Sequence, residues 1–442
     1  MSILIFLQVI LIFIVVIGAL NQRFFHMQSD IALILFSTVI SLILLVISEC
    51  LDLKQMTALV NGLGGFGFEE YLMDGALCFM LFAGASKVNI RKFRENMRAI
   101  SLLAFLSTML SSAFYGVLFF GVSYVFGLNM DILTCILLGC VVSPTDPIAA
   151  TGILSKIGLS KNVCSVIENE SLFNDGTGVT LFLFVKSLVI QSGQSNFAVL
   201  IIKEIAGAVG VALIVSFVMF GMMKHTREPI MYILISLLDV SLVYNICELF
   251  GFSGVIASVV CGMYFSWAYS GMERRIRVID PRDLYRDFWD IAENLLNAVL
   301  FVMIGILVMG MDVSRYILIL IPAAVIINLI ARSFGVTVSS FLTGSRHIPG
   351  NYSISEYVTL MTWSALKGGL SLALAFGTKE FLPGEIHIVF LNVTYVTIFF
   401  TVLVQGLSVK KVYLALEEHR SARMAGMRQA ARENSSEGNS SL

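Results

Sequence analysis

Apolar runs of about 20 residues recur along most of this 442-residue chain. A helix rises 1.5 Å per residue, so a run of this length crosses about 30 Å of hydrocarbon. Lipid satisfies no backbone polar group, and each crossing must therefore be helical. The chain is 57% hydrophobic and 13% charged, against about 45–50% and about 25% in soluble domains. The sequence predicts an all-α polytopic membrane protein.

We predict about thirteen spans. The first has neither a basic segment before it nor a cleavage site of small residues after it, so we expect it to stay in the mature protein. The glycine-rich residues 61–67 lack a strand-turn-helix context and are expected to form a loop or a re-entrant segment. Residues 1–408 would form the membrane domain, and residues 409–442 a short tail, partly disordered. The predicted spans are 3–20, 31–48, 71–86, 99–126, 132–154, 169–190, 197–222, 229–250, 253–270, 291–311, 316–342, 355–377 and 386–407.

Basic residues fall almost entirely on one side of this topology. Loops after the odd-numbered spans, together with the tail, hold most of the 29 lysines and arginines, whereas the opposite loops hold only Lys54, Arg315 and Lys379. Because cytoplasmic loops collect positive charge, we expect the amino terminus outside and the carboxyl terminus in the cytoplasm. The basic segments 87–98 and 274–286 are expected to be solvated inner loops, with anionic-lipid or regulatory binding as the alternative.

Ionisable residues inside the spans are candidate functional residues, because a charge at the bilayer centre costs at least ~2.5–3.5 kcal/mol. Two acidic clusters lie on neighbouring spans, at residues 143–147 and 168–178. In the second, Ser171 and Asp175 are four residues apart and therefore share a helical face. A hydroxyl and a carboxylate on one face suit Na⁺, a hard cation that prefers oxygen ligands. Asp239 also lies within a span, and its role stays open.

Helix breakers interrupt two of the spans. Pro144 and Pro147 lack backbone donors and disfavour a continuous helix around Asp146, which frees carbonyl groups as ligands. In the twelfth span, Lys367 stands before a pair of glycines. The interrupted spans are the fifth and the twelfth. They occupy equivalent positions if spans one to six and spans eight to thirteen are two repeats of one unit. Such a pattern is typical of transporters built from inverted repeats.

Several segments resemble the motifs of the monovalent cation:proton antiporter family, which includes bacterial and animal sodium/proton exchangers. The combination covers most of the predicted membrane domain and is more specific than its Pro-Thr-Asp-Pro segment alone. Lys367 departs from the family pattern, which usually has arginine there, so the charge is kept and bidentate pairing is lost. The matching segments are residues 145–147, 170–176, 248–254, 296–301 with 304–305, and 366–372.

The resemblance implies a secondary active antiporter that exchanges Na⁺ or Li⁺ for H⁺ across a bacterial cytoplasmic membrane and serves pH homeostasis. It implies the sodium/proton antiporter fold, in which two crossed discontinuous helices belong to a transport bundle that moves against the dimerisation bundle of a homodimer. Asn174, directly before the aspartate, resembles the electroneutral branch and implies 1:1 exchange. The expected partners are the two ions and membrane lipids, with no cofactor, no enzymatic activity and no nucleic acid.

Our mechanistic hypothesis places Asp175 at the centre of the site. The carboxylate would hold either a cation or a proton, with Ser171, Asp146 and Thr145 completing an oxygen shell around Na⁺. Either occupant neutralises the carboxylate, whereas moving an empty site would carry a buried charge across the barrier. Protons and cations would then compete for one group, and turnover should fall at both pH extremes.

Four other residues are predicted to support the site. Glu170 would pair with a base inside the membrane, with Arg332 as the first choice and Lys367 as the second, because an unpaired carboxylate and an unpaired base in one core are both costly. Asn174 would brace the unwound backbone near Asp146.

Three alternative functions remain at this point. Potassium/proton exchange on the same fold is the nearest, because ligand types do not determine cavity size. An intramembrane enzyme that uses Asp146 and Asp175 as paired carboxylates is a remote alternative. A passive channel is disfavoured, since a channel needs no residues that couple two ions.

Overall fold

The computed structural model describes residues 3–50, 75–190, 197–226, 228–270, 281–310, 312–344 and 347–439. The regular elements of this part of the chain are all helices, joined by turns and loops, and one isolated β-bridge pairs Asp146 with Leu366. Nine of its helices are long and apolar enough to cross a membrane, and three shorter apolar helices accompany them. The protein is therefore a multi-pass, all-α membrane protein, as predicted from the apolar runs. The glycine-rich residues 61–67 lie outside the described residues.

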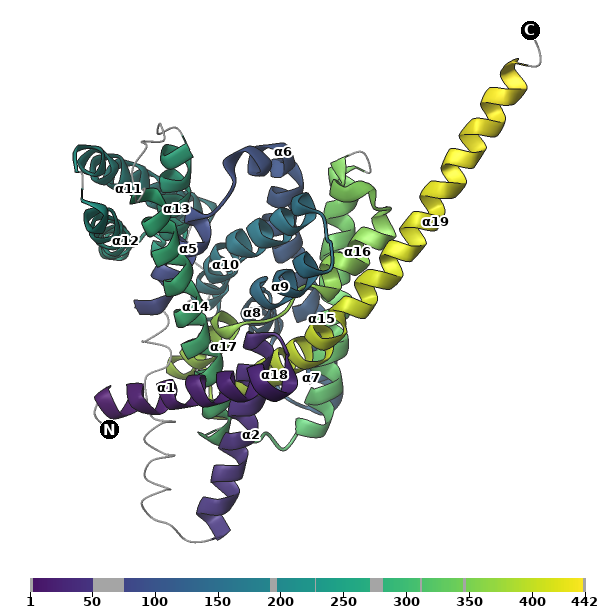
Figure 1. Cartoon of the computed structure of the whole chain (residues 1–442). Coiled ribbons are helices and arrows are strands. Elements are labelled where there is room, and N and C mark those ends of the chain that lie inside the picture. The colour runs from purple at the N-terminus through teal and green to yellow at the C-terminus, as the bar shows by residue number, and fades with distance from the viewer. Residues whose placement is uncertain are drawn as a thin grey trace.

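The helices pack as two groups (Figure 1). The outer bundle consists of α1 (Ile3–Leu20), α2 (Ser29–Cys50), α5 (Leu77–Ser86), α11 (Phe197–His225), α12 (Pro229–Leu249), α13 (Gly254–Ser270) and α14 (Pro281–Leu307). The site bundle consists of α6 (Ile90–Ser101), η3 (Leu102–Ser107), α7 (Thr108–Phe126), α8 (Ile132–Val142), α9 (Ile148–Lys156), α10 (Lys161–Ile190), α15 (Ile317–Thr343), α16 (Ile354–Trp363), α17 (Gly369–Phe376), α18 (Gly384–Phe399), η8 (Phe400–Gln405) and α19 (Gly406–Asn439).

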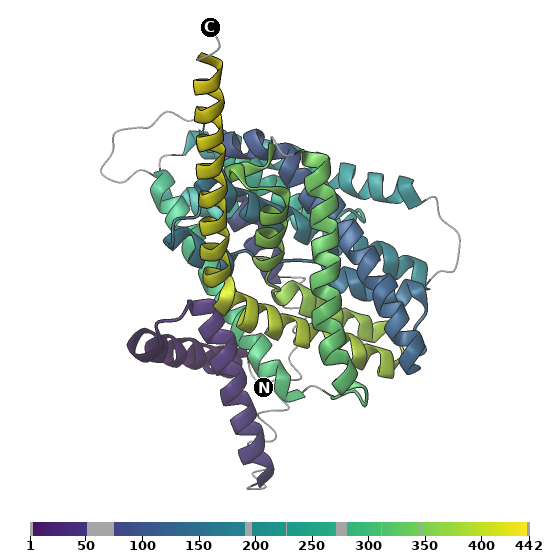
Figure 2. The ribbon, with the colours of Figure 1, turned by 90° about the vertical axis from the view of Figure 1, so that its right-hand side faces the viewer.

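Most predicted spans coincide with described helices, and the differences occur at the ends. Helices α10 and α14 begin at Lys161 and Pro281, eight and ten residues before the predicted spans. The additional turns mix polar and charged residues with apolar ones, so hydropathy detects only the more uniformly apolar remainder of each helix. Helix α19 runs from the end of the membrane domain through most of the tail, to Asn439. Figure 2 shows this helix projecting beyond the rest of the molecule.

Close helix packing holds the outer bundle together. In α13, Gly262 lies against α5 so tightly that a Cβ atom there would stand 2.6 Å from the Phe82 carbonyl oxygen. Only a residue without a side chain allows this approach.

The two bundles meet where α10 packs against α5 and α13, and where α17 packs against α14. The candidate site lies along this boundary.

Candidate ion-binding site

The two interrupted spans cross at their breaks. Helix α8 ends at Val142 and α9 begins at Ile148, while α16 ends at Trp363 and α17 begins at Gly369. The Asp146 backbone N–H donates to the Leu366 carbonyl at 2.8 Å, which joins the two unwound segments as a single antiparallel bridge. The prediction of two crossed discontinuous helices is therefore confirmed.

Lys367 binds the crossing from the α16–α17 side. Its buried ammonium donates to the Ser143 carbonyl at 3.0 Å, at the carboxyl end of α8. A positive charge is favourable there, because the last carbonyls of a helix are unpaired and carry partial negative charge. The next residue, Gly368, brings its backbone close to Asp146, and a Cβ atom at Gly368 would stand 3.0 Å from an Asp146 carboxylate oxygen. Lys367 therefore supports the break, and its ammonium contacts Ser143 instead of Glu170.

Helix α10 holds the α8–α9 break in place through Thr145. The Asn174 side chain accepts from the Thr145 backbone N–H at 3.2 Å and donates to the Thr145 hydroxyl at 2.6 Å. The Ser171 hydroxyl donates to the Thr145 carbonyl. These bonds pair backbone groups that the prolines leave outside regular helix. Asn174 lies where the sequence predicted a brace.

Glu170 and Arg332 form an ion pair inside the site bundle. The guanidinium of Arg332, on α15, lies 3.0 Å from the Glu170 carboxylate, and the two side chains are 5% and 2% exposed. Asn174 donates to the same carboxylate oxygen at 2.9 Å. Removing either charge would leave the other buried without a counter-charge, which is why such pairs are costly to break.

The four predicted ion ligands line one cavity of about 940 Å³ between the two bundles: Thr145, Asp146, Ser171 and Asp175. The two aspartates are partly exposed to this space, whereas Thr145 and Ser171 are buried. No residue that the structure describes donates a recorded hydrogen bond to the Asp175 carboxylate, so its oxygens are available to an ion in the cavity.

Two further polar residues face this cavity and were not predicted as site residues. Asn297, on α14, is 2% exposed, and neither its amide oxygen nor its amide nitrogen has a hydrogen-bond partner in the described structure. The buried hydroxyl of Ser371, on α17, is likewise without a described partner. Buried polar groups are normally hydrogen-bonded, so these groups are suited to an ion or its water. Both occur within the family-like segments, and this was the signal that could have identified them.

Acidic side chains line the same cavity farther from Asp175. They are Glu168 on α10 and Glu293 on α14, and the cavity also reaches Ser155, Lys87 and Lys92. These residues lie near the loops that carry most of the basic residues, which is the side predicted to be cytoplasmic. Lysines line the cavity as well, and Lys87 contacts Glu293, so the glutamates attract cations only with the part of their charge that these lysines leave unneutralised.

The chain is similar to known antiporters over most of its length. It is 29% identical over 409 residues to the Na(+)/H(+) antiporter NhaP of Pseudomonas aeruginosa, covering 88% of this chain and 91% of that protein. It is 27% identical over 355 residues to the low-affinity Na(+)/H(+) antiporter NhaS1 of Synechocystis, covering 79% of this chain and 65% of that protein.

The fold and the family agree with these relatives. The structure of the sodium proton antiporter MjNhaP1 from Methanocaldococcus jannaschii at pH 8 matches with a TM-score of 0.71 and 20% identity, covering 94% of this chain and 99% of that one. The family profile described as "Sodium/hydrogen exchanger, transmembrane" matches residues 56–415. The chain belongs to this sodium/hydrogen exchanger family.

Proposed function

We propose that the protein exchanges Na⁺ for H⁺ at Asp175. The observation that carries this proposal is a carboxylate that faces a cavity inside a membrane protein without a described hydrogen-bond donor, beside the oxygen-bearing Ser171, Thr145 and Asp146. Membership of a transporter family sets aside the intramembrane enzyme.

The exchange mechanism follows from charge. Asp175 holds Na⁺ or H⁺, and both neutralise the carboxylate, so the loaded site crosses the barrier more easily than the empty one. Because the two ions compete for one group, turnover falls when protons are so abundant that Na⁺ cannot bind, and again when protons are too scarce. Asn174 is neutral and engaged with Thr145, which supports a single exchanging charge and electroneutral 1:1 stoichiometry.

The two bundles supply the moving parts. We infer that the site bundle moves against the outer bundle, because the cavity lies between them and the ligands belong to one of them. The cavity reaches the loops that carry most of the basic residues, and these loops are predicted to lie in the cytoplasm. The structure then corresponds to a state in which the ion site is open to the cytoplasm. By analogy with the family, the outer bundle forms the interface of a homodimer in the bacterial cytoplasmic membrane. In this proposal residues 1–408 suffice for exchange, and residues 409–442 form a cytoplasmic tail.

Na⁺ is preferred to K⁺ in this proposal because the relatives are named for Na⁺. The ligand types themselves suit either ion, so K⁺/H⁺ exchange is the alternative. The ligand set contains oxygen atoms only, which suits a hard alkali cation. Li⁺ would share the Na⁺ site.

The test is ion-driven proton movement in vesicles. Purified protein is reconstituted with an imposed pH gradient, and Na⁺, Li⁺ and K⁺ are added in turn. We expect Na⁺ and Li⁺ to dissipate the gradient, and Asp175→Asn to abolish the response while Asp239→Asn retains it. A wild-type protein that responds to no cation, or an Asp175→Asn variant that responds fully, would overturn the proposal, and a response to K⁺ alone would replace Na⁺ by K⁺.

A further inference from the structure

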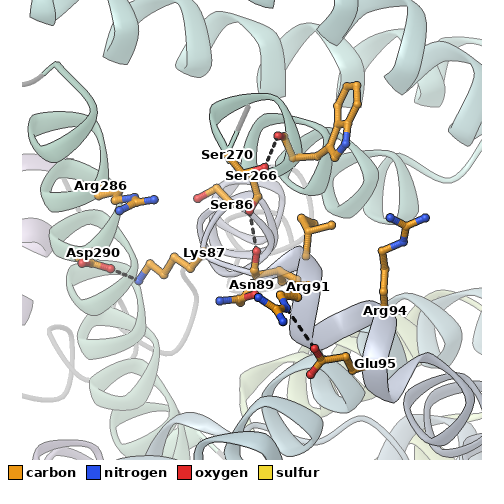
Figure 3. A pocket seen from close by; sticks show the side chains of 13 residues that line it. Ser86, Lys87, Asn89, Arg91, Arg94, Glu95, Ser266, Ser270, Arg286 and Asp290 are labelled. Carbon is orange, nitrogen blue, oxygen red and sulfur yellow. Dashed lines mark hydrogen bonds and ion pairs between the residues drawn. The ribbon is translucent and has the colours of Figure 1, made fainter. Parts of the chain in front are cut away.

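A second cavity, of about 970 Å³, lies near the loops of the side predicted to be cytoplasmic, and Asp175 is not among its lining residues. Figure 3 shows the side chains that line it. The cavity lies where the linker between α5 and α6 meets the end of α13 and the first turns of α14. The linker joins the outer bundle to the site bundle, and the Ser266 hydroxyl of α13 fastens it by donating to the Val88 carbonyl at 2.6 Å. A ligand in this cavity would therefore contact both bundles.

Basic side chains dominate the lining of this cavity. Arg91 and Arg94 come from α6, Arg286 comes from α14, and Lys87 ends α5. Two carboxylates offset part of this charge: Arg91 lies 3.3 Å from Glu95, and Lys87 contacts Asp290. These partners leave the cavity with a net positive charge.

Arg94 and Arg286 differ from the other two basic residues of the lining, Lys87 and Arg91, which contact carboxylates. Both Arg94 and Arg286 are exposed, and among the described residues neither has a recorded salt-bridge partner. Figure 3 shows them on opposite sides of the cavity, Arg94 on α6 and Arg286 on α14. Arginine guanidinium groups match the oxygens of a phosphate in charge and geometry.

The start of α6 adds backbone donors to this cavity. Asn89 caps the helix by accepting from the Lys92 N–H, while the Ile90 and Arg91 N–H groups precede the first intrahelical bond and have no acceptor recorded in the described structure. Free N–H groups at a helix start attract anions. Trp267 lies at the same cavity and is 58% exposed, and tryptophan is enriched at the level of lipid headgroups.

We propose that this cavity binds the phosphate headgroup of an anionic phospholipid from the cytoplasmic leaflet. Arg94, Arg286 and the start of α6 would hold the phosphate, and Trp267 would lie beside the glycerol and upper acyl chains. A lipid source is favoured over free phosphate because an exposed indole and the apolar side chains of Val88 and Ile90 line the same cavity.

Lys87 connects this cavity with the ion cavity. It lines both, and its ammonium contacts Asp290 of the lipid cavity and Glu293 of the ion cavity. A phosphate beside Lys87 would compete with Glu293 for the ammonium. The Glu293 carboxylate would then be less neutralised and would attract cations to the ion cavity more strongly. Anionic lipid is thus expected to stimulate exchange. This consequence rests on the proposed function, whereas the proposal that the lipid binds here does not.

Binding is tested on the purified full chain in neutral detergent. The probes are dioctanoyl phosphatidylglycerol, dioctanoyl phosphatidylcholine and inorganic phosphate, and the readout is the concentration dependence of the thermal unfolding midpoint. The test variant is Arg94→Gln with Arg286→Gln. The matched control is Arg23→Gln with Lys156→Gln, which removes two exposed positive charges outside the cavity.

We expect phosphatidylglycerol alone to raise the midpoint, and each lost arginine to weaken its apparent affinity by about fivefold. The control should bind like the wild type. Equal weakening in the control, equal effects of both lipids, or an equal effect of inorganic phosphate would overturn the proposal of an anionic-lipid site. Because the variant and the control are compared on folded protein, a variant that does not fold is replaced by the Arg94→Lys and Arg286→Lys pair, which should retain most of the binding.

The coupling is tested by exchange in vesicles with and without phosphatidylglycerol. The lipid should raise the wild-type rate several-fold and leave the Arg94→Gln, Arg286→Gln variant at its rate in neutral vesicles. Lys87→Gln should be insensitive to the lipid, since Glu293 is already released. Stimulation by the lipid that remains in the arginine variant would overturn the proposed link between lipid binding and exchange. A lack of exchange in all vesicles would count against the proposed function. The binding experiment alone would then decide whether the lipid site exists.

Discussion

Two carboxylates five residues apart on α10 have opposite surroundings. Glu170 is 2% exposed and is neutralised by Arg332 at 3.0 Å, with Asn174 donating to the same oxygen. Asp175 faces the ion cavity, and the described structure records no donor for it. A buried charge in a membrane helix therefore does not by itself identify an ion site. The candidate ion-binding group is the carboxylate that lacks a described protein partner and can be reached through a cavity.

The largest expected effect on stability is that of Glu170→Gln. The change leaves the Arg332 charge buried without its counter-charge, so we expect a loss of about 3–5 kcal/mol in the free energy of unfolding. Denaturant titration in detergent measures this loss. Glu168→Gln is the matched control, because Glu168 is exposed on the same helix, and it should change stability by less than about 0.5 kcal/mol. Equal losses in the two variants would contradict the ion pair.

The next prediction concerns the pair as a unit. Glu170→Gln combined with Arg332→Gln removes both charges, so the loss should be smaller than the sum of the single losses by about 0.5–3 kcal/mol. The same titration on the two single variants and the double variant completes the cycle. Strictly additive losses would show that the two charges do not interact.

Asp239 extends the comparison to the outer bundle. Its buried carboxylate accepts from Ser216 at 2.9 Å and from the Cys261 thiol at 2.8 Å, and it does not line the ion cavity. Asp239→Asn keeps an acceptor oxygen, so we expect a loss of about 0.5–1.5 kcal/mol, the value of a typical hydrogen bond. Exchange in vesicles should stay close to the wild-type rate. Loss of exchange with an intact fold would make Asp239 part of the ion pathway.

Lys87 offers an exposed counterpart to the buried pair. Burial lowers the pKa of Lys87, but attraction by Glu293 and Asp290 outweighs this effect and raises the pKa above its ordinary value of 10.5. A raised lysine pKa adds stability that is fully present below pH 10.5 and is lost only as the pH rises through the folded-state value. Lys87→Gln should thus cost up to about 1 kcal/mol, equally at pH 6 and pH 9. A cost that changes between these two pH values would contradict this ion pair.

Asp175→Asn should have the smallest effect on stability and the largest effect on exchange. No hydrogen bond or ion pair recorded in the described structure is lost, so the free energy of unfolding should change by less than about 0.5 kcal/mol. Unfolding titrations and vesicle exchange on one protein preparation measure both quantities. A stability loss as large as that of Glu170→Gln would mean that Asp175 has a structural partner, and the contrast between the two carboxylates would fail.

Sequence patterns predicted much of the fold because the bilayer imposes simple rules. Apolar runs of about 20 residues must be helices, and prolines or paired glycines within them favour interruptions, although α15 continues through Pro322. The breaks before Ile148 and Gly369 were therefore predictable. The early starts of α10 and α14 were not, because a polar first turn outside the hydrocarbon leaves no hydropathy signal.

The sequence by itself determined that this is a helical membrane protein with two interrupted spans, and that Ser171 and Asp175 share a face. These features depend only on residues close together in the chain, because an apolar run in lipid must pair its own backbone groups as a helix and the helical period then decides which residues share a face. Only the tertiary structure decided that Arg332 instead of Lys367 neutralises Glu170, that Lys367 binds the end of α8, and that Asn297 lines the same cavity as Asp175. Those contacts join residues far apart in the chain, and helix packing alone determines which of several suitable partners comes within bonding distance.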